Sequence, residues 1–566
     1  MFLDVIYRWG QIINQPDLAL DQILESKTNL QETSAGRKRR SLVHDAMIPR
    51  TMSTQHPDNA RVPEWCGGSI IEGDAEVREA FLAFSSLGCD EAMWDSEGKD
   101  IDTNVVRKLL SDYPDYFRDN VIGESVFLTY RIPNPRIEVA ERKIVTQTLQ
   151  TIPLSADVAS LFHKRKTIPV FEVILPFTTT GKELLWLHEY YRQAISGAEG
   201  LRLDGSIVVK DWVGSFRPKT ISVIPLIEDI RSLLAIDRIV REYIERVRVR
   251  SLRVFIARSD PALNYGLLSA VILSKLALSK LGGVERTTGV RIHPIIGVGS
   301  MPFRGHLNPE NVERFLMEYK GLSTATTQSA LRYDHPPEKV KRTIRILNEN
   351  LPNGEPVNIS KEDEELLRGS LDKFKASYQN RIEELAALIN ALASYVPERR
   401  ARKLHIGLFG YSRSVRSVTT PRAIPFAAVF YSMGIPPEFI GVEALRDLSE
   451  REWKAVESCY LNMKHDLGVA GKYVSWESIN MLMEMNQRVA KRVAIDEEKL
   501  RAGLGRLMSD LAVAEELLSI RLGPSDNVSR RHENFINNFL ISYIDNEDND
   551  ARVAFIEAAM LRRCLG

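Results

Sequence analysis

Short apolar segments rich in β-branched residues alternate with helical stretches from about residue 85 onwards. Each segment has the length of a strand, and the stretch after it has apolar residues at helical spacing. Seven segments are clear: "EAMWD" (91–95), "SVFLTYRIP" (125–133), "IPVFEVILP" (168–176), "TISVIPLIED" (220–229), "LRVFIARSD" (252–260), "VRIHPIIGVGS" (290–300) and "LHIGLFGYS" (404–412). An eighth strand is expected at "ATTQSALRY" (325–333) or at "FIGVEAL" (439–445). Alternating strands and helices indicate a parallel sheet, and eight strands predict an α/β fold of the (β/α)8 TIM-barrel type rather than an open doubly wound sheet.

Many additional helices are expected around this barrel. The stretch 361–396 has helical periodicity throughout, and so do the residues after 475. We therefore expect a single catalytic domain over 47–566, with the barrel at roughly 85–445 and a helical C-terminal part. Residues 1–46 differ, because an amphipathic opening leads into a polar connector that ends in "RKRRS". They are expected to form an N-terminal extension, an amphipathic helix followed by a basic flexible linker.

Charge and composition exclude several classes of protein. The 566 residues include 75 Lys and Arg against 75 Asp and Glu, so no net field recommends the chain as a binder of nucleic acid or of a membrane surface. The "RKRR" run is the only feature that favours nucleic acid, and it has no interleaved aromatic residues to stack on bases. We expect no nucleic-acid partner.

Membrane insertion and disulfide bonding are not expected either. No apolar run reaches the ~20 residues of a membrane helix, and no signal sequence opens the chain, so the cytoplasm is the expected location. The four cysteines, Cys66, Cys89, Cys459 and Cys564, are far apart and have no CxxC spacing. This pattern argues against a disulfide framework or a zinc site.

Polar and charged residues gather where the predicted strands end. They are Asp95, Arg131, Glu228, Asp260, Arg304, Arg413 and Arg416. Any one of them could be an ordinary loop residue just past its strand. The same placement in six segments favours an active site, since catalytic residues of barrel enzymes gather at the carboxyl ends of the strands.

The types of these residues indicate the chemistry. Glu228 and Asp260 are hard oxygen ligands on neighbouring strands, of the kind that hold Mg²⁺ or Mn²⁺. Several arginines facing such a metal imply an anionic substrate, because guanidinium groups bind phosphate and carboxylate in a bidentate manner. A phosphorylated carboxylic acid could bind both the metal and the arginines. The "GVGSMPFRG" stretch is not a dinucleotide fingerprint, and it more plausibly brings backbone and Arg304 to an anion.

A histidine in "RTMSTQHPDN" (50–59) is a further candidate. Pro57 restricts the residue before it to extended backbone, so His56 should be held stiffly. The alternative is an ordinary turn, because Pro-Asp-Asn is common turn chemistry and a lone histidine in a turn is usually solvated.

Nine stretches together resemble the archaeal-type phosphoenolpyruvate carboxylases. They are "MSTQHPDN", "MWDSEGKD", "TYRIPNP", "FEVILPFTTT", "VIPLIED", "ARSDPALNYG", "FRGHLNPEN", "TTQSALRYDHP" and "SRSVRSVTTPRAIPF". They occur in family order from about residue 47 to the final "RRCLG", and "STQHPDN" is the most distinctive. The resemblance implies an anaplerotic lyase that fixes CO₂ by carboxylating phosphoenolpyruvate with bicarbonate to oxaloacetate and phosphate. It also implies a homotetramer.

The resemblance implies roles for individual residues. Glu228 and Asp260 match the two carboxylates that bind Mg²⁺ or Mn²⁺, and Arg413 and Arg422 match arginines that flank the phosphate. Arg304 resembles the arginine that handles bicarbonate. The essential histidine of "TAHPTE" in the longer bacterial and plant enzymes corresponds to His56, implying that this residue steadies carboxyphosphate and retains the CO₂ released from it.

Some positions depart from the longer enzymes. A lysine of those enzymes aligns with Leu263, and an arginine of their "HGRGG" loop is missing around Val298. Their mobile loop is shortened here, with Arg416 as the expected substitute contact, while Arg131 and Lys99 are further candidates for the lost charge. Another metal-dependent barrel lyase or mutase acting on phosphoenolpyruvate or pyruvate remains the alternative function; it would need neither the histidine nor bicarbonate.

Overall fold

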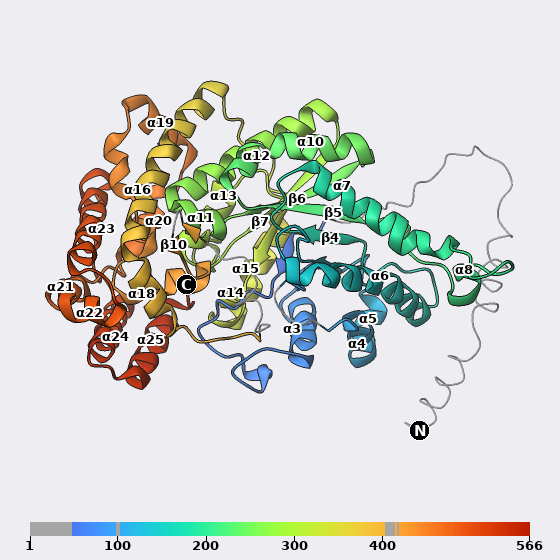
Figure 1. The fold of residues 1–566 in the computed structure, drawn as a ribbon, viewed down its shortest axis with the longest axis horizontal. Helices are drawn as coiled ribbons and strands as arrows, with labels where there is room; N and C mark the ends of the chain where they lie inside the picture. Colours follow the sequence, from blue (N-terminus) through green and yellow to red (C-terminus); the bar gives the residue numbers. More distant parts are fainter. Residues whose placement is uncertain (1–47, 98–101, 402–413, 416–417) are drawn as a thin grey trace.

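A computed structural model of the protein describes residues 48–97, 102–401, 414–415 and 418–566 (Figure 1). Several sequence predictions fall outside these residues. They are the N-terminal extension 1–46, the proposed strand at 404–412, and the candidates Lys99, Arg413 and Arg416.

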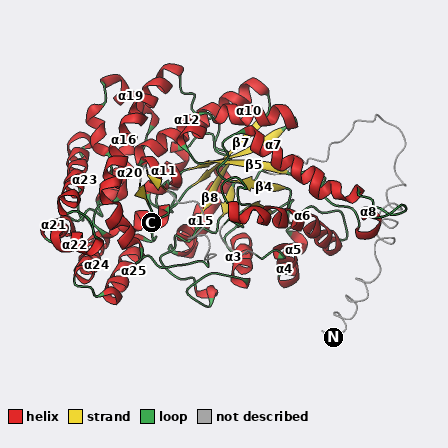
Figure 2. Cartoon of the chain, in the orientation of Figure 1, coloured by secondary structure: helices red, strands yellow, loops and turns green. Residues whose placement is uncertain are grey.

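Eight parallel strands form a closed barrel in chain order, which confirms the predicted fold class (Figure 2). The strands are β1 (Thr51–Ser53), β2 (Glu91–Asp95), β3 (Phe127–Arg131), β4 (Glu172–Leu175), β5 (Ser222–Ile227), β6 (Ser251–Ala257), β7 (Arg291–Gly297) and β8 (Thr324–Thr327). A separate antiparallel pair is formed by β9 (Ser414–Val415) and β10 (Val418–Thr419).

The barrel begins and ends earlier than predicted, so the expected limits of 85 and 445 are wrong. Strand β1 pairs with β2 through Met52 and Glu91, and with β8 through Thr51 and Ala325. The first alternative for the missing strand, 325–333, therefore contains most of β8, whereas 439–445 overlaps two 3₁₀ turns. Neither closing strand has a recognisable apolar run, because β1 reads "TMS" and β8 reads "TATT".

Helices cover the barrel and extend to one side of it (Figure 1). The 33-residue helix α16 (Lys361–Ala393) is capped by Ser360, whose hydroxyl accepts a hydrogen bond from the Asp363 amide. The helices around the barrel are α3 (Asp74–Ser85), α4 (Val105–Asp112), α5 (Pro114–Asp119), α6 (Arg142–His163), α7 (Gly181–Tyr190), α8 (Val209–Val213), α9 (Ile230–Leu234), α10 (Ile236–Val247), α11 (Ser259–Tyr265), α12 (Leu267–Thr288), α13 (Val312–Glu318), α14 (Ser329–Tyr333) and α15 (Pro337–Asn350). The helical C-terminal part comprises α16 (Lys361–Ala393), α18 (Ala423–Ser432), α19 (Glu450–Cys459), α20 (Met463–Gly471), α21 (Trp476–Glu484), α22 (Asn486–Val493), α23 (Glu497–Leu518), α24 (Asn527–Ile544) and α25 (Asp548–Arg562).

Helix α12 is long and apolar enough to cross a membrane by composition alone, with a mean hydropathy of 1.6 in its most apolar window. In the structure 89% of that window is buried. The helix packs against α10, α11 and α16, so its apolar composition is explained by a position in the core.

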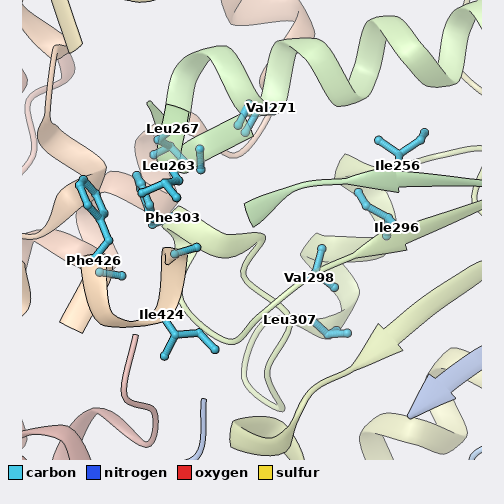
Figure 3. Close-up of a cluster of buried hydrophobic side chains, with 14 of the residues drawn as sticks. Ile256, Leu263, Leu267, Val271, Ile296, Val298, Phe303, Leu307, Ile424 and Phe426 are labelled. Carbon is cyan, nitrogen blue, oxygen red and sulfur yellow. The ribbon is translucent and has the colours of Figure 1, made fainter. Parts of the chain in front are cut away.

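An apolar cluster joins the barrel to the helical part (Figure 3). Ile256 and Ile296, on β6 and β7, belong to the same buried cluster as Leu263 on α11 and Phe426 on α18. Leu263, which the family resemblance aligns with a lysine of longer enzymes, is fully buried in this cluster. The cluster thus fixes the loops at the carboxyl ends of these strands against the C-terminal helices.

The barrel interior also contains a buried ionic layer. Arg253 on β6 makes two hydrogen bonds to Glu91 on β2, at 2.8 and 2.6 Å, and one to Glu172 on β4 at 3.0 Å. Only 3% of the arginine surface is exposed. Arg253 therefore compensates two carboxylates across the barrel.

Replacing Arg253 with leucine should destabilise the protein by roughly 3–5 kcal/mol, since it leaves buried carboxylates without a cation. Chemical denaturation measures the change. Arg118→Leu is the control, because Arg118 pairs with Asp115 at the surface and its loss should have little effect. Equal effects of the two variants would contradict a structural role for the internal ion pair.

Candidate active site

A cavity opens at the carboxyl ends of the barrel strands and brings together residues distant in sequence. Seven candidates from the sequence line it: His56, Asp95, Arg131, Glu228, Asp260, Arg304 and Arg422. Asp95 and Arg131 are the last residues of β2 and β3. His56, Glu228, Asp260 and Arg304 come after β1, β5, β6 and β7, and Arg422 immediately precedes α18. Converging strand ends thus place carboxylates, arginines and a histidine around one space.

The segment that bears His56 is held by buried polar contacts, two of them from Arg332 on α14. His56 lies three residues beyond β1, and its Nδ1 is 2.9 Å from the hydroxyl of Thr54. Arg332 donates to the Ser53 hydroxyl at 2.7 Å and to the Thr54 carbonyl at 2.6 Å. These contacts support the predicted stiffness of the segment, and the side chain of His56 contributes to the cavity wall rather than to a solvated turn.

Glu228 and Asp260 lie on one wall of the cavity. Strands β5 and β6 pair through Ile227 and Ile256, so the residues that follow them emerge side by side. Glu228 accepts a hydrogen bond from the Phe177 amide at 2.8 Å, and Asp260 lies in the first turn of α11. Two carboxylates just beyond the ends of adjacent strands form a donor set that suits a hard divalent cation such as Mg²⁺ or Mn²⁺.

Arg304 is almost completely buried, with 1% of its surface exposed. Its Nη1 donates to Asp58 at 3.1 Å and to the carbonyl of Gly566 at 2.8 Å. Its other nitrogens donate to Gln328 and Ser259. The sequence predicted a fixed positive charge here, and the structure adds the contacts that fix it.

Similarity to known proteins identifies the family. A family model described as phosphoenolpyruvate carboxylase matches residues 48–566. The chain belongs to this family. Three curated relatives named phosphoenolpyruvate carboxylase come from Metallosphaera sedula, Caldivirga maquilingensis and Picrophilus torridus, with identities of 45%, 43% and 42%. Each alignment covers 92% of this chain and 99–100% of the relative.

Within this cavity, Arg131 faces two acidic neighbours. One guanidinium nitrogen lies 3.4 Å from Asp95, and another contacts Glu97. All three residues line the cavity. The arginine is therefore balanced by carboxylates and does not by itself restore the positive charge that the longer carboxylases have at other positions.

Four residues that shape the candidate site were absent from the sequence predictions. Asp58 and Gln328 hold Arg304, and both belong to stretches that resemble the family, so that resemblance was the available signal. Arg258 directly follows β6, and its guanidinium donates to the carbonyls of Phe303 and Pro302. Gly566 could not have been predicted, because nothing in the sequence indicates that its carbonyl reaches Arg304.

Asp334 supports the loop that follows the histidine. Its carboxylate accepts hydrogen bonds from the amides of Ala60 and Arg61, at 2.7 and 2.8 Å. Burial raises the pKa of Asp334 from 3.8 to about 7, even though both amides favour the charged form. The folded protein thus binds a proton at this site more readily than the unfolded chain does.

A raised pKa in the folded state makes stability depend on pH. The contribution of Asp334 is fully present below pH 3.8 and is lost as the pH rises through about 7. Asp334→Asn removes the titration. The free energy of unfolding of the native protein, minus that of the variant, should therefore decrease from pH 5 to pH 8 in denaturation experiments. A difference that stays constant over this range would contradict the assignment.

Proposed function

We propose that this chain carboxylates phosphoenolpyruvate with bicarbonate, producing oxaloacetate and phosphate. The observation that supports this function is the shared cavity of Glu228, Asp260, His56, Arg304 and Arg422, in a chain that belongs to the carboxylase family. Residues 47–566 act as one catalytic domain in this proposal.

The reaction proceeds in two stages. A bicarbonate oxygen attacks the phosphorus of phosphoenolpyruvate, and the bond from phosphorus to the enol oxygen breaks, giving carboxyphosphate and pyruvate enolate. Carboxyphosphate then divides into phosphate and CO₂, and the enolate carbon forms a bond to CO₂. Negative charge moves onto the enolate oxygen in the first stage, so fixed cationic groups around the cavity stabilise the transition state.

Different cationic residues bind the phosphate of phosphoenolpyruvate and the bicarbonate. Arg422, at the N-terminus of α18, and Arg413 and Arg416, in the preceding segment, bind the phosphate. Arg304 orients bicarbonate, and Arg131, held by Asp95, forms the opposite part of the binding surface. His56 holds carboxyphosphate and keeps CO₂ beside the enolate.

Glu228 and Asp260 would hold a divalent cation, Mg²⁺ or Mn²⁺. When bound, the cation supplies Lewis acidity and neutralises charge on the substrate. The proposal also includes a cytoplasmic homotetramer, as the family resemblance implies. Light scattering on the purified protein tests the tetramer, and a monomer would contradict it.

Oxaloacetate formation from phosphoenolpyruvate should require both bicarbonate and a divalent cation. Asp260→Asn removes an anionic ligand with little change in shape, so the Mg²⁺ concentration needed for half-maximal activity should rise by about tenfold or more. A coupled assay over a Mg²⁺ series measures this change. Native activity of the variant at limiting Mg²⁺ would contradict the ligand assignment, while consumption of phosphoenolpyruvate that does not depend on bicarbonate would favour the alternative lyase or mutase.

His56→Asn should uncouple the two stages, because bicarbonate can still attack phosphorus but CO₂ escapes before the enolate captures it. Phosphate and pyruvate release should then exceed oxaloacetate formation. Asparagine keeps a hydrogen-bond donor but cannot exchange a proton as a general acid or base does. Phosphate, pyruvate and oxaloacetate are measured in the same reaction. Equal yields of phosphate and oxaloacetate in an active variant would exclude the proposed role.

A further inference from the structure

The loop that bears Arg304 has an unusual backbone. Gly305 has a φ of 120°, and His306 has a φ of 61° although it is not glycine. A Cβ atom at position 305 would lie 2.4 Å from Val298, so only glycine fits there. The chain therefore turns sharply just after Arg304, and contacts around His306 must maintain that turn.

Those contacts come from the helical C-terminal part. His306 is buried, and its Nδ1 lies 2.6 Å from a carboxylate oxygen of Asp466 on α20. The second carboxylate oxygen accepts a hydrogen bond from the Tyr460 hydroxyl at 2.7 Å. Asn311 donates to the backbone carbonyl of His306 at 2.8 Å. Side chain and backbone of His306 are thus both held, 160 residues from Asp466 in sequence.

The rest of the loop is held from two further directions. The amide of Phe303 donates to Glu438 at 2.9 Å, and the carbonyl of Phe303 accepts from Arg258 at 3.1 Å. Glu438 is fully buried. The backbone just before Arg304 is therefore held by Glu438, which is not among the residues that line the cavity, and by Arg258, which is.

His306, His465 and Asp466 are also close enough together to hold a metal ion. Their donor atoms already have partners, however. Asp466 uses its two oxygens for His306 and Tyr460, and His465 Nε2 lies 3.1 Å from the Asn311 oxygen. Because Asn311 donates its own amide group to His306, its oxygen is the acceptor in that contact. A hydrogen-bond network explains the cluster without an ion.

We propose that Asp466, acting through His306, positions Arg304 for bicarbonate. Neither residue touches a reactant; both are positioning residues that maintain the turn after Arg304. Displacing the guanidinium should weaken its interaction with bicarbonate and leave the binding of phosphoenolpyruvate largely intact, since other arginines bind the phosphate. This inference rests on the proposed role of Arg304 in handling bicarbonate.

Steady-state kinetics with separate variation of the two substrates tests the proposal. His306→Asn is the informative variant, because asparagine tolerates positive φ but is too short to replace the histidine ring. Asp466→Asn removes the charge opposite the ring. In both variants the KM for bicarbonate should rise by about tenfold, with less than about a twofold change in the KM for phosphoenolpyruvate. Tyr460→Phe removes one hydroxyl only and should give a smaller rise in the same parameter.

Asp510→Asn is the matched control. Asp510 is a buried carboxylate of the same helical part, and its hydrogen bonds go to Arg381, at 2.9 Å, and to the amides of Gly441 and Glu443 rather than to residues 303–306. Its variant should lose thermal stability and keep the native KM for bicarbonate. A similar rise in KM in this control would show that general destabilisation is responsible, and would overturn the proposal.

Arg304→Lys distinguishes the role of Arg304 in handling bicarbonate from the positioning role of His306 and Asp466. If it raises the KM for bicarbonate while the His306, Asp466 and Tyr460 variants do not, the positioning role is overturned and the role of Arg304 stands. If it leaves that KM unchanged, both assignments fail. Metal analysis of the purified protein adds a last criterion: one zinc ion per chain that is lost in His465→Asn would overturn the hydrogen-bond interpretation.

Discussion

The buried ion pair between Asp58 and Arg304 is the interaction on which the geometry of the site depends. Both side chains are almost fully enclosed, with 0% and 1% of their surfaces exposed. Asp58 also accepts a hydrogen bond from the Ala330 amide, so the ends of β1, β7 and β8 meet at this carboxylate. A buried charge that loses its partner is costly. The loop of His56 and the loop of Arg304 therefore keep their positions relative to each other.

Charge compensation sets the character of the cavity. Arg304 is paired with Asp58, Arg131 is paired with Asp95 and Glu97, and Glu228 and Asp260 add negative charge on the wall beyond β5 and β6. This arrangement differs from a simple ring of arginines around an anion. A cation between Glu228 and Asp260 fits the balance, because an anionic substrate alone would meet carboxylates on that wall.

The sequence predicted most of the fold, and the exceptions have a physical cause. Strands β2 to β7 were evident because each is a buried apolar run between turn residues. Strands β1 and β8 have three and four residues and contain threonines, so their burial comes from barrel closure rather than from composition. The candidate residues at strand ends were predictable because parallel strands converge at one rim. The pairing of Arg131 with Asp95 and Glu97, and the groups that hold Arg304, were not predicted, because they depend on which loops meet in space.

Closure of the barrel through β1 has a consequence for how the protein is made. Thr51 pairs with Ala325, and the Leu565 amide donates to the carbonyl of Asp58. During synthesis on a ribosome, β1 cannot pair with β8 until more than half of the chain has been translated. The hydrogen bond between Asp58 and Leu565 forms only after almost the whole chain has been translated. Such distant pairings fold slowly and leave strand edges open meanwhile. The contacts that close the barrel and hold the Asp58 loop are thus incomplete until the last helices have been translated.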